Sequence, residues 1–164
     1  MRFDLKHDFG APVAAVEDAM VDAEYLAALR LPDVAPPTVL GVEANGTTVT
    51  TRVAYQYTGS LDAIAERVLR GSDIGWVQEV ILDRTTHRAR FTVVPKAHAE
   101  RLRCSGTYTL SERDGTTTRV ISGDLRINVP LVASRAEKMI VPGLVRRMRL
   151  EASFLEQWLS QHSG

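Results

Sequence analysis

A long apolar stripe near the C-terminus is the feature that most constrains the fold of this chain. Residues 131–159 read LVASRAEKMIVPGLVRRMRLEASFLEQWL, and apolar side chains recur there at the three- and four-residue spacing of a helix with one buried face. The residues of this stripe are Ala136, Met139, Ile140, Leu144, Val145, Met148, Phe154, Leu155, Trp158 and Leu159. Pro142 removes one helical hydrogen bond, so we expect a kink or a restart there. Such a helix needs a large apolar surface to pack against.

The sequence before this helix has the periodicity of strands. Residues 2–9 alternate charged side chains with Phe3, Leu5, His7 and Phe9, which is the two-residue period of a half-buried strand. Further strands are predicted at 38–44, 47–57, 76–84, 88–95, 102–112 and 117–129, with tight turns at Asn45-Gly46 and Asp114-Gly115. Each predicted strand has one apolar face, so together they predict an antiparallel sheet.

Short helices are predicted between some of these strands. Pro12 suits the first turn of a helix, and Val13, Val16, Ala19 and Met20 follow it at helical spacing. Asp22 can cap a second short helix whose apolar face is Tyr25, Leu26 and Leu29. Another helix is predicted at 60–70. The complete order predicts an α+β domain in which a curved, seven-stranded antiparallel sheet surrounds one long helix, with two short helices after the first strand.

Length and composition exclude several classes of protein. The 164 residues match one ordinary domain, residues 1–164, which would bury roughly 70% of its unfolded surface. Lys plus Arg and Asp plus Glu number 20 each, so no net charge attracts nucleic acid. No apolar run is long enough for membrane integration or a signal peptide, and the single cysteine, Cys104, permits no internal disulfide. We therefore expect a cytoplasmic protein; homo-oligomers are possible but not indicated.

Two segments and the order of elements resemble the START-like superfamily (SRPBCC), which has the helix-grip fold and includes polyketide cyclases, lipid-transfer domains and plant ligand-binding allergens. The segments are MRFDLKHDFGAPVAAVEDAMVDAEYLAAL and DLRINVPLVASRAEKMIVPGLVRRMRLEASFLEQWL. Both are similar to a group in this superfamily labelled only as a domain of unknown function. The resemblance implies a helix-grip fold with a cavity between sheet and helix, which usually holds a hydrophobic or amphipathic small molecule.

We predict that inward-facing side chains of the sheet and of the long helix line this cavity. The predicted ligand-binding residues are Leu5, His7, Val53, Tyr55, Tyr57, Trp76, Phe91, Cys104, Tyr108, Leu125, Ile127, Met139, Leu144 and Met148. Apolar burial would supply most of the affinity, and His7 or a tyrosine would fix the orientation of the ligand. The alternative is that the tyrosines and the helical methionines pack in an ordinary core.

No spacing of residues predicts a catalytic or metal-binding arrangement, so we expect no metal, no cofactor and no assigned catalytic residue. His7, Glu79 and Tyr108 are the candidates for an acid or base. The strand at 76–84 has two possible registers, one that buries Trp76 with Gln78 and one that buries Glu79. We favour the first because it buries more apolar area.

Binding or transport of a hydrophobic small molecule, such as a lipid, an isoprenoid or a polyketide-like compound, is the function that these features favour. Two alternatives stay open: an enzyme of the polyketide-cyclase or dehydratase type that uses an acid or base in the same cavity, and a protein-interaction module whose cavity is filled. Arg146, Arg147 and Arg149 precede Glu151 and Glu156, so we expect a salt-bridged outer face there.

Overall fold

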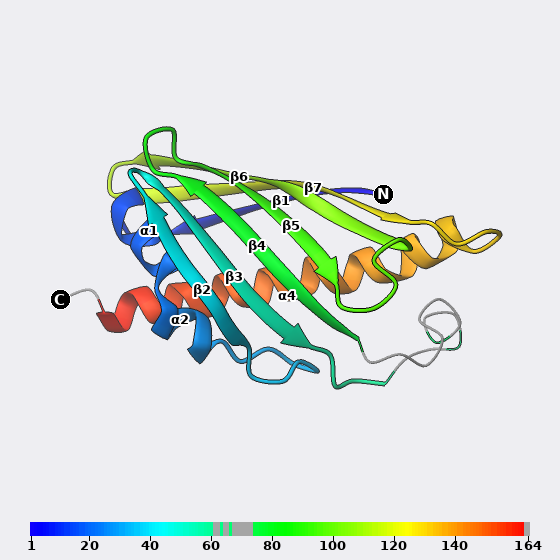
Figure 1. Ribbon diagram of the computed structural model, residues 1–164. Coiled ribbons are helices and arrows are strands. Elements are labelled where there is room, and N and C mark those ends of the chain that lie inside the picture. The colour runs from blue at the N-terminus through cyan, green and yellow to red at the C-terminus, as the bar shows by residue number, and fades with distance from the viewer. Residues whose placement is uncertain (61–62, 64–65, 67–73, 163–164) are drawn as a thin grey trace.

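The computed structural model describes residues 1–60, 63, 66 and 74–162. One sheet of seven antiparallel strands, in the order β1-β7-β6-β5-β4-β3-β2, curves over the long helix α4 (Figure 1). The strands are β1 (Arg2–Phe9), β2 (Thr38–Asn45), β3 (Thr48–Gln56), β4 (Gly75–Asp83), β5 (Arg88–Pro95), β6 (Leu102–Arg113) and β7 (Thr116–Ile127), and the helices are α1 (Val13–Val21), α2 (Ala23–Ala28) and α4 (Ala133–His162). The predicted α+β architecture is confirmed. Most of the helix predicted at 60–70 lies outside the described residues.

The alternating pattern of the first strand is confirmed. Phe3, Leu5 and Phe9 are buried, and their charged neighbours are exposed. Strand β1 pairs with β7, where Leu5 lies opposite Ile121. This pairing places the first strand beside the last one, so the sheet is built from both ends of the sequence.

The two short helices after β1 are also confirmed. The side chain of Asp22 caps α2, because its Oδ1 accepts a hydrogen bond from the backbone N–H of Glu24 at 2.8 Å. Tyr25 and Leu26 of α2 are buried. The capping residue therefore starts a helix whose apolar face packs into the core, as predicted.

Two polar contacts attach α1 to the loop between β4 and β5. Glu17 is 2% exposed, and its carboxylate lies 2.8 Å from Nδ1 of His87. Beside it, Arg84 pairs with Asp18 at 2.7 Å. These contacts hold α1 across one end of the sheet.

The hairpin between β2 and β3 has its turn one position later than predicted. Asn45 pairs with Thr48, so the two central residues are Gly46 and Thr47 instead of Asn45 and Gly46. Gly46 has a φ of 61°, which glycine adopts without steric cost. The turn at Asp114-Gly115 lies where it was predicted.

The favoured register of β4 is confirmed. Gln78 and Leu82 are buried, and Trp76 is half-buried and packs against the core. Glu79 lies on the outer face, where its carboxylate is 2.7 Å from Nε of Arg52 on β3. The alternation of the strand therefore directs the amide of Gln78, and not the carboxylate of Glu79, toward α4.

Helix α4 is one continuous element, so the restart, one of the two outcomes expected at Pro142, does not occur; the other, a kink, stays a prediction. Pro142 lies inside the helix and is exposed. The missing hydrogen bond costs one interaction in a helix of 30 residues, and the ring of Pro142 points away from the packed face. At the start of the helix, Oε1 of Glu137 accepts a hydrogen bond from the backbone N–H of Ile127 at 2.9 Å, which joins α4 to the end of β7.

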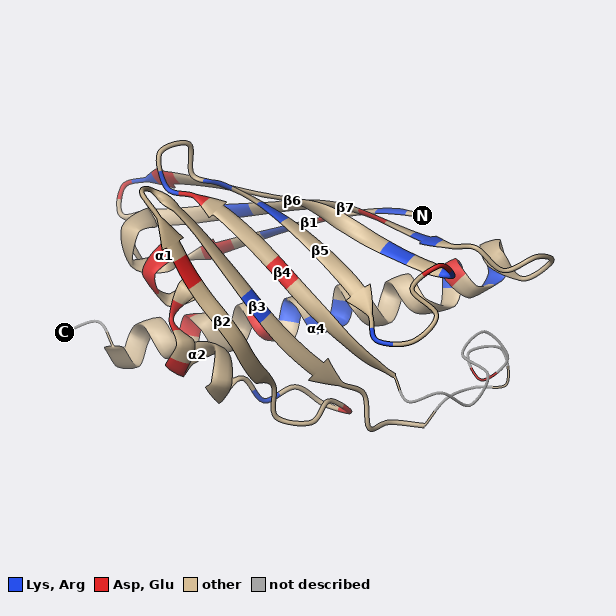
Figure 2. Cartoon of the chain, viewed as in Figure 1, with Lys and Arg blue, Asp and Glu red and all other residues tan. Residues whose placement is uncertain are grey.

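Basic and acidic positions are interspersed along the strands, and basic positions also occupy the middle of α4 (Figure 2). This distribution agrees with the equal numbers of acidic and basic residues. Among the described residues, no helix is both long and apolar enough to cross a membrane.

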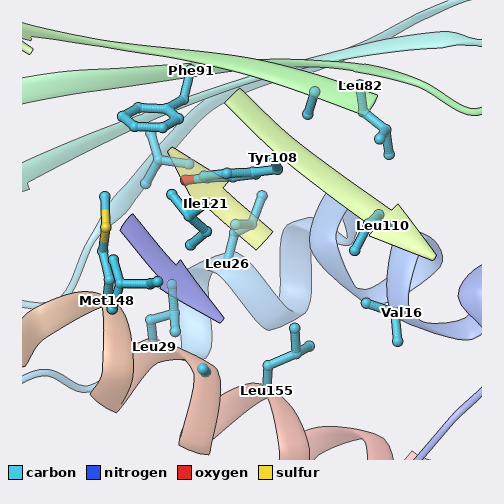
Figure 3. Close-up of a cluster of buried hydrophobic side chains, with 14 of the residues drawn as sticks. Val16, Leu26, Leu29, Leu82, Phe91, Tyr108, Leu110, Ile121, Met148 and Leu155 are labelled. Atoms are coloured by element: carbon cyan, nitrogen blue, oxygen red, sulfur yellow. The ribbon is translucent and has the colours of Figure 1, made fainter. Parts of the chain in front are cut away.

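The core is densest where α1, α2 and the C-terminal half of α4 meet the sheet (Figure 3), and we call this region the packed end. Phe9, Val16 and Leu155 are 0% exposed there. The ring of Tyr25 lies 5.6 Å from that of Trp158. The space found toward this region measures only about 30 Å³, far below ligand size.

Candidate ligand-binding cavity

A cavity of about 380 Å³ lies between the sheet and the N-terminal half of α4, away from α1 and α2. Its walls come from α4, from strands β4 to β7, and from the segments around positions 32–34, 57–60 and 97–101. We call this region the cavity end. The same sheet and helix that pack closely at one end therefore separate enough at the other to leave a space of ligand size.

Most of the cavity wall is apolar. The apolar lining side chains include Val34, Trp76, Val93, Leu102, Cys104, Leu125, Met139, Ile140 and Leu144. Met139 is 41% exposed, and Ile140 and Leu144 are half-buried, although all three belong to the apolar stripe of α4. Their apolar surface is thus available to a bound molecule.

The charged groups of the wall are predominantly basic. Among the described residues, Arg101, Arg146 and Arg147 line the cavity together with His98 and one carboxylate, that of Asp33. Arg101 lies 3.4 Å from the exposed carboxylate of Glu100. The whole chain has balanced charge, whereas the described charged groups around the cavity are mainly positive.

Arg147 has the most unusual environment of these three arginines. Its Nη2 donates a hydrogen bond to Oε1 of Gln78 at 2.8 Å. The guanidinium carbon lies 5.2 Å from the ring centre of Tyr55 and 5.3 Å from that of Trp76, and these two rings are stacked 5.3 Å apart. The guanidinium thus lies over the junction of two aromatic faces, a favourable cation–π arrangement. Its Nε and Nη1 are buried and have no hydrogen-bond partner.

The cavity brings together only part of the predicted ligand-binding set. The predicted residues that line it are Tyr57, Trp76, Cys104, Leu125, Met139 and Leu144. The others, namely Leu5, His7, Val53, Tyr55, Phe91, Tyr108, Ile127 and Met148, face the interior but do not line this cavity. Strand and helix periodicity identifies the inner face, but it does not tell which part of that face neighbouring elements fill.

A second, much smaller space of about 30 Å³ lies deeper, toward the packed end. Tyr25, Tyr55, Tyr108, Arg119 and Glu151 are among the residues that line it. Burial, and next the nearby carboxylate of Glu151, raise the pKa of all three tyrosines above the usual range, so their hydroxyls stay protonated at neutral pH. The space is large enough for about one water molecule, not for a ligand.

His7 lies on the inner side of β1, away from the cavity. Its Nδ1 is buried and has no hydrogen-bond partner. Burial, followed by the positive charges of Arg119 and Arg149, lowers the pKa of His7 below its ordinary value. His7 is therefore a neutral imidazole at physiological pH and does not contact the cavity wall.

The lining thiol is not a reactive group. Cys104 is 3% exposed, and burial raises the pKa of its thiol to about 11. The thiolate is the nucleophilic form, so Cys104 acts as a small apolar side chain, as predicted. Within the part of the chain that the structure describes, no group of three or more His, Cys, Asp or Glu residues could hold a metal ion.

Comparison with known families identifies the chain's relatives. Residues 4–159 match the family described as Protein of unknown function (DUF2505). The chain belongs to the DUF2505 family. The match spans nearly all of both segments whose resemblance the sequence had suggested. No curated protein matches the chain.

Solved structures show that this DUF2505 chain has a START-like helix-grip fold. The protein TTHA0849 from Thermus thermophilus superposes with a TM-score of 0.71 at 18% identity, covering 100% of both chains. The Zhui aromatase/cyclase from Streptomyces sp. R1128 gives 0.71 at 14% identity, covering 100% of this chain and 96% of that one. Ara h 8.0201 gives 0.66 at 15% identity and 99% coverage of both chains. At these identities the similarity establishes the fold.

Sequence reasoning missed two inward arginines of this DUF2505 chain. Arg147 was expected on the outer face of α4 with Arg146, yet it lies over Tyr55. Arg119 is 3% exposed, and its guanidinium lies 5.6 Å from the ring of Tyr108. The spacing of the sequence could have placed both side chains inward. Arg147 follows Leu144 by three residues on the apolar stripe of the helix, and Arg119 is two residues from Ile121, so it lies on the same face of its strand. For Arg147, the acidic residues that follow it had suggested an exposed position.

Proposed function

We propose that this DUF2505 protein binds a hydrophobic small molecule in the cavity between α4 and the sheet. The observation that carries the proposal is the cavity itself, because about 380 Å³ of mostly apolar space falls within the range of about 300–1,000 Å³ of typical small-molecule sites. Burial of apolar ligand surface would stabilise the complex by about 25 cal/mol per Å² before the costs of association are subtracted.

The ligand classes that suit this wall are fatty-acyl, isoprenoid and polyketide-like compounds. Met139, Ile140 and Leu144 form a flexible aliphatic side, and Trp76 supplies a flat aromatic one. One solved structure with this fold is an aromatase/cyclase, which supports a polyketide-like compound as one member of the class. Carriage, storage or sensing of such a compound would use the same cavity.

Binding is favoured over the two alternatives by where the side chains lie. The acid and base candidates His7, Glu79 and Tyr108 do not line the cavity, so none of the groups predicted for acid–base catalysis is placed there. A protein-interaction module with a filled interior requires that no connected space of ligand size be present, and the cavity volume opposes that.

Filling the cavity tests the proposal. N-phenyl-1-naphthylamine is a neutral apolar probe whose fluorescence rises when it leaves water, so its titration measures occupancy of the cavity. Val93 of β5 lines the cavity, whereas its neighbour Val94 is 48% exposed on the opposite face. We expect Val93→Trp to weaken probe binding at least tenfold and Val94→Trp to change it less than twofold.

Thermal melting of both variants is the control for folding. Equal probe affinity in the folded Val93→Trp variant and in the wild type would contradict the proposal. Native mass spectrometry of the protein purified from cells, followed by organic extraction, would then identify the class of any bound molecule.

A further inference from the structure

Arg147 is a half-buried cation whose Nε and Nη1 atoms are themselves buried. Among the described residues no carboxylate forms an ion pair with it, and its only hydrogen bond is to the neutral amide of Gln78. Other arginines have carboxylate partners, such as Arg52 with Glu79 and Arg84 with Asp18. Burying a charged group is unfavourable unless the group is paired, so an anion that accepts hydrogen bonds from Arg147 would stabilise it.

The surroundings of Arg147 also select what kind of anion fits. Tyr55 and Trp76 hold the guanidinium by its face, and Gln78 accepts from one edge, so the donors that are left without partners, Nε and Nη1, belong to the other edges. A guanidinium binds a planar carboxylate through two parallel hydrogen bonds, which an ammonium group cannot reproduce. Each of its two-donor edges includes Nη2, so the edge that Gln78 does not occupy still offers the second N–H of Nη2 together with Nε or Nη1. The mostly apolar walls around it suit a hydrocarbon body.

We infer that the ligand of this cavity is an amphipathic carboxylate whose charged head accepts hydrogen bonds from Arg147 while its apolar body lies along Trp76 and Leu144. This inference rests on the proposed function and narrows it to one class of ligand. Arg146, which also lines the cavity and is exposed, adds positive charge that attracts the same head group. The net charge of the chain is zero, so the attraction is local to the cavity.

Matched pairs of ligands test the inference on the wild-type protein. Dodecanoate and 1-dodecanol share a chain, and 2-naphthoate and 2-naphthylmethanol share a ring system, so each pair differs mainly in the charge of the head. Affinity is measured by displacement of N-phenyl-1-naphthylamine. We expect the carboxylate of at least one pair to bind at least tenfold more tightly than its alcohol. Equal affinity within both pairs would overturn the inference.

Variants of Arg147 then test whether this residue causes the preference for carboxylates over alcohols. Arg147→Met retains an apolar stem and removes the charge, and it should reduce the affinity ratio of carboxylate to alcohol within each pair to about one, while the alcohols and the neutral probe still bind. For Arg147→Lys, the difference in binding free energy between a carboxylate and its matched alcohol should be less than half of the wild-type difference, because lysine cannot form the paired hydrogen bonds. Arg149→Gln is the matched control, since Arg149 is exposed on the same helix and does not line the cavity.

The melting temperature of the ligand-free Arg147→Met variant distinguishes a binding role of Arg147 from a structural role. Loss of the cation–π contacts and of the hydrogen bond to Gln78 opposes the gain from removing an unpaired charge, so the melting temperature should change little, whereas substitution of a purely structural arginine would lower it. A lower melting temperature with an unchanged carboxylate preference overturns the inference. If neither the neutral probe nor any ligand binds, the proposed function fails; if the probe and the alcohols bind without a carboxylate preference, only this inference fails.

Discussion

The two halves of α4 face the same sheet in different ways. In the C-terminal half, Ala152 and Leu155 are 3% and 0% exposed, because α1 and α2 complete the packing around them. In the N-terminal half, Ile140 and Leu144 are only half-buried and line an open cavity. One continuous amphipathic helix therefore packs in a closed core with its C-terminal half and lines the cavity with its N-terminal half.

Because of this difference, we expect one half of α4 to contribute mainly to stability and the other mainly to binding. Close-packed interiors lose much stability when side chains are removed, while a cavity that is already open loses fewer contacts. Binding sites commonly retain such unfavourable features as exposed apolar surface or half-buried charge, and the cavity end has both, in Met139 and Arg147. Mutations at the packed end should thus change folding, and mutations at the cavity end should change binding.

The largest expected effect compares two leucines of α4. Leu155→Ala should lower the free energy of unfolding by about 3–5 kcal/mol, because it opens a void in a fully packed site. Leu144→Ala removes the same atoms from the cavity wall and should cost about 1–2 kcal/mol. Urea denaturation followed by circular dichroism measures both. Equal losses would show that α4 is equally packed at the packed end and at the cavity end, and would contradict the difference between them.

A smaller effect is expected where the packed end is held to the loop after β4. His87→Asn removes the imidazole beside the buried carboxylate of Glu17 and should cost about 1–3 kcal/mol, because that carboxylate loses its partner. Asparagine tolerates the φ of 54° at this position, so the backbone contributes little. Arg84→Gln is the comparison, since it breaks the more exposed pair with Asp18 and should cost about 0–1 kcal/mol. A smaller loss for His87→Asn than for Arg84→Gln would contradict this assignment.

The smallest expected effect is a pH dependence due to His7. Its pKa in the folded protein is below the ordinary value of 6.5, so the unfolded chain binds a proton first as the pH falls. Stability should therefore decrease from about pH 6.5 down to the lowered pKa and then become independent of this group. His7→Phe should flatten that part of the stability profile measured by denaturation at several pH values, without changing probe affinity. An unchanged slope would show that the histidine is not the group responsible.

Much of the fold was predictable because it depends on local periodicity. The alternation around Leu5 and the cap at Asp22 need only neighbouring residues, and both are confirmed. The register of β4 required a choice between Trp76 and Glu79 on the inner face, and the larger apolar area decided it correctly. Of the kink or restart expected at Pro142, the restart does not occur, because the loss of one hydrogen bond is small beside the packing of a long helix.

The candidate site was predictable only in part, because its position depends on contacts between distant segments. Tyr57, Trp76 and Leu144 line the cavity as expected, while Phe91 and Met148 face the same interior but pack in the core. Periodicity cannot separate these groups, since they have the same inward orientation.

By itself, the amino-acid sequence determined the order of the strands and helices, their apolar faces and the family resemblance, because these follow from patterns within short segments. The tertiary structure decided which part of the interior stays open, because α1 and α2 cover only one end of α4. It also decided the environment of Arg147, whose neighbours Tyr55, Trp76 and Gln78 are far away in sequence. A charged residue whose sequence neighbours suggest solvent exposure is therefore half-buried against aromatic rings only once the helix packs on the sheet.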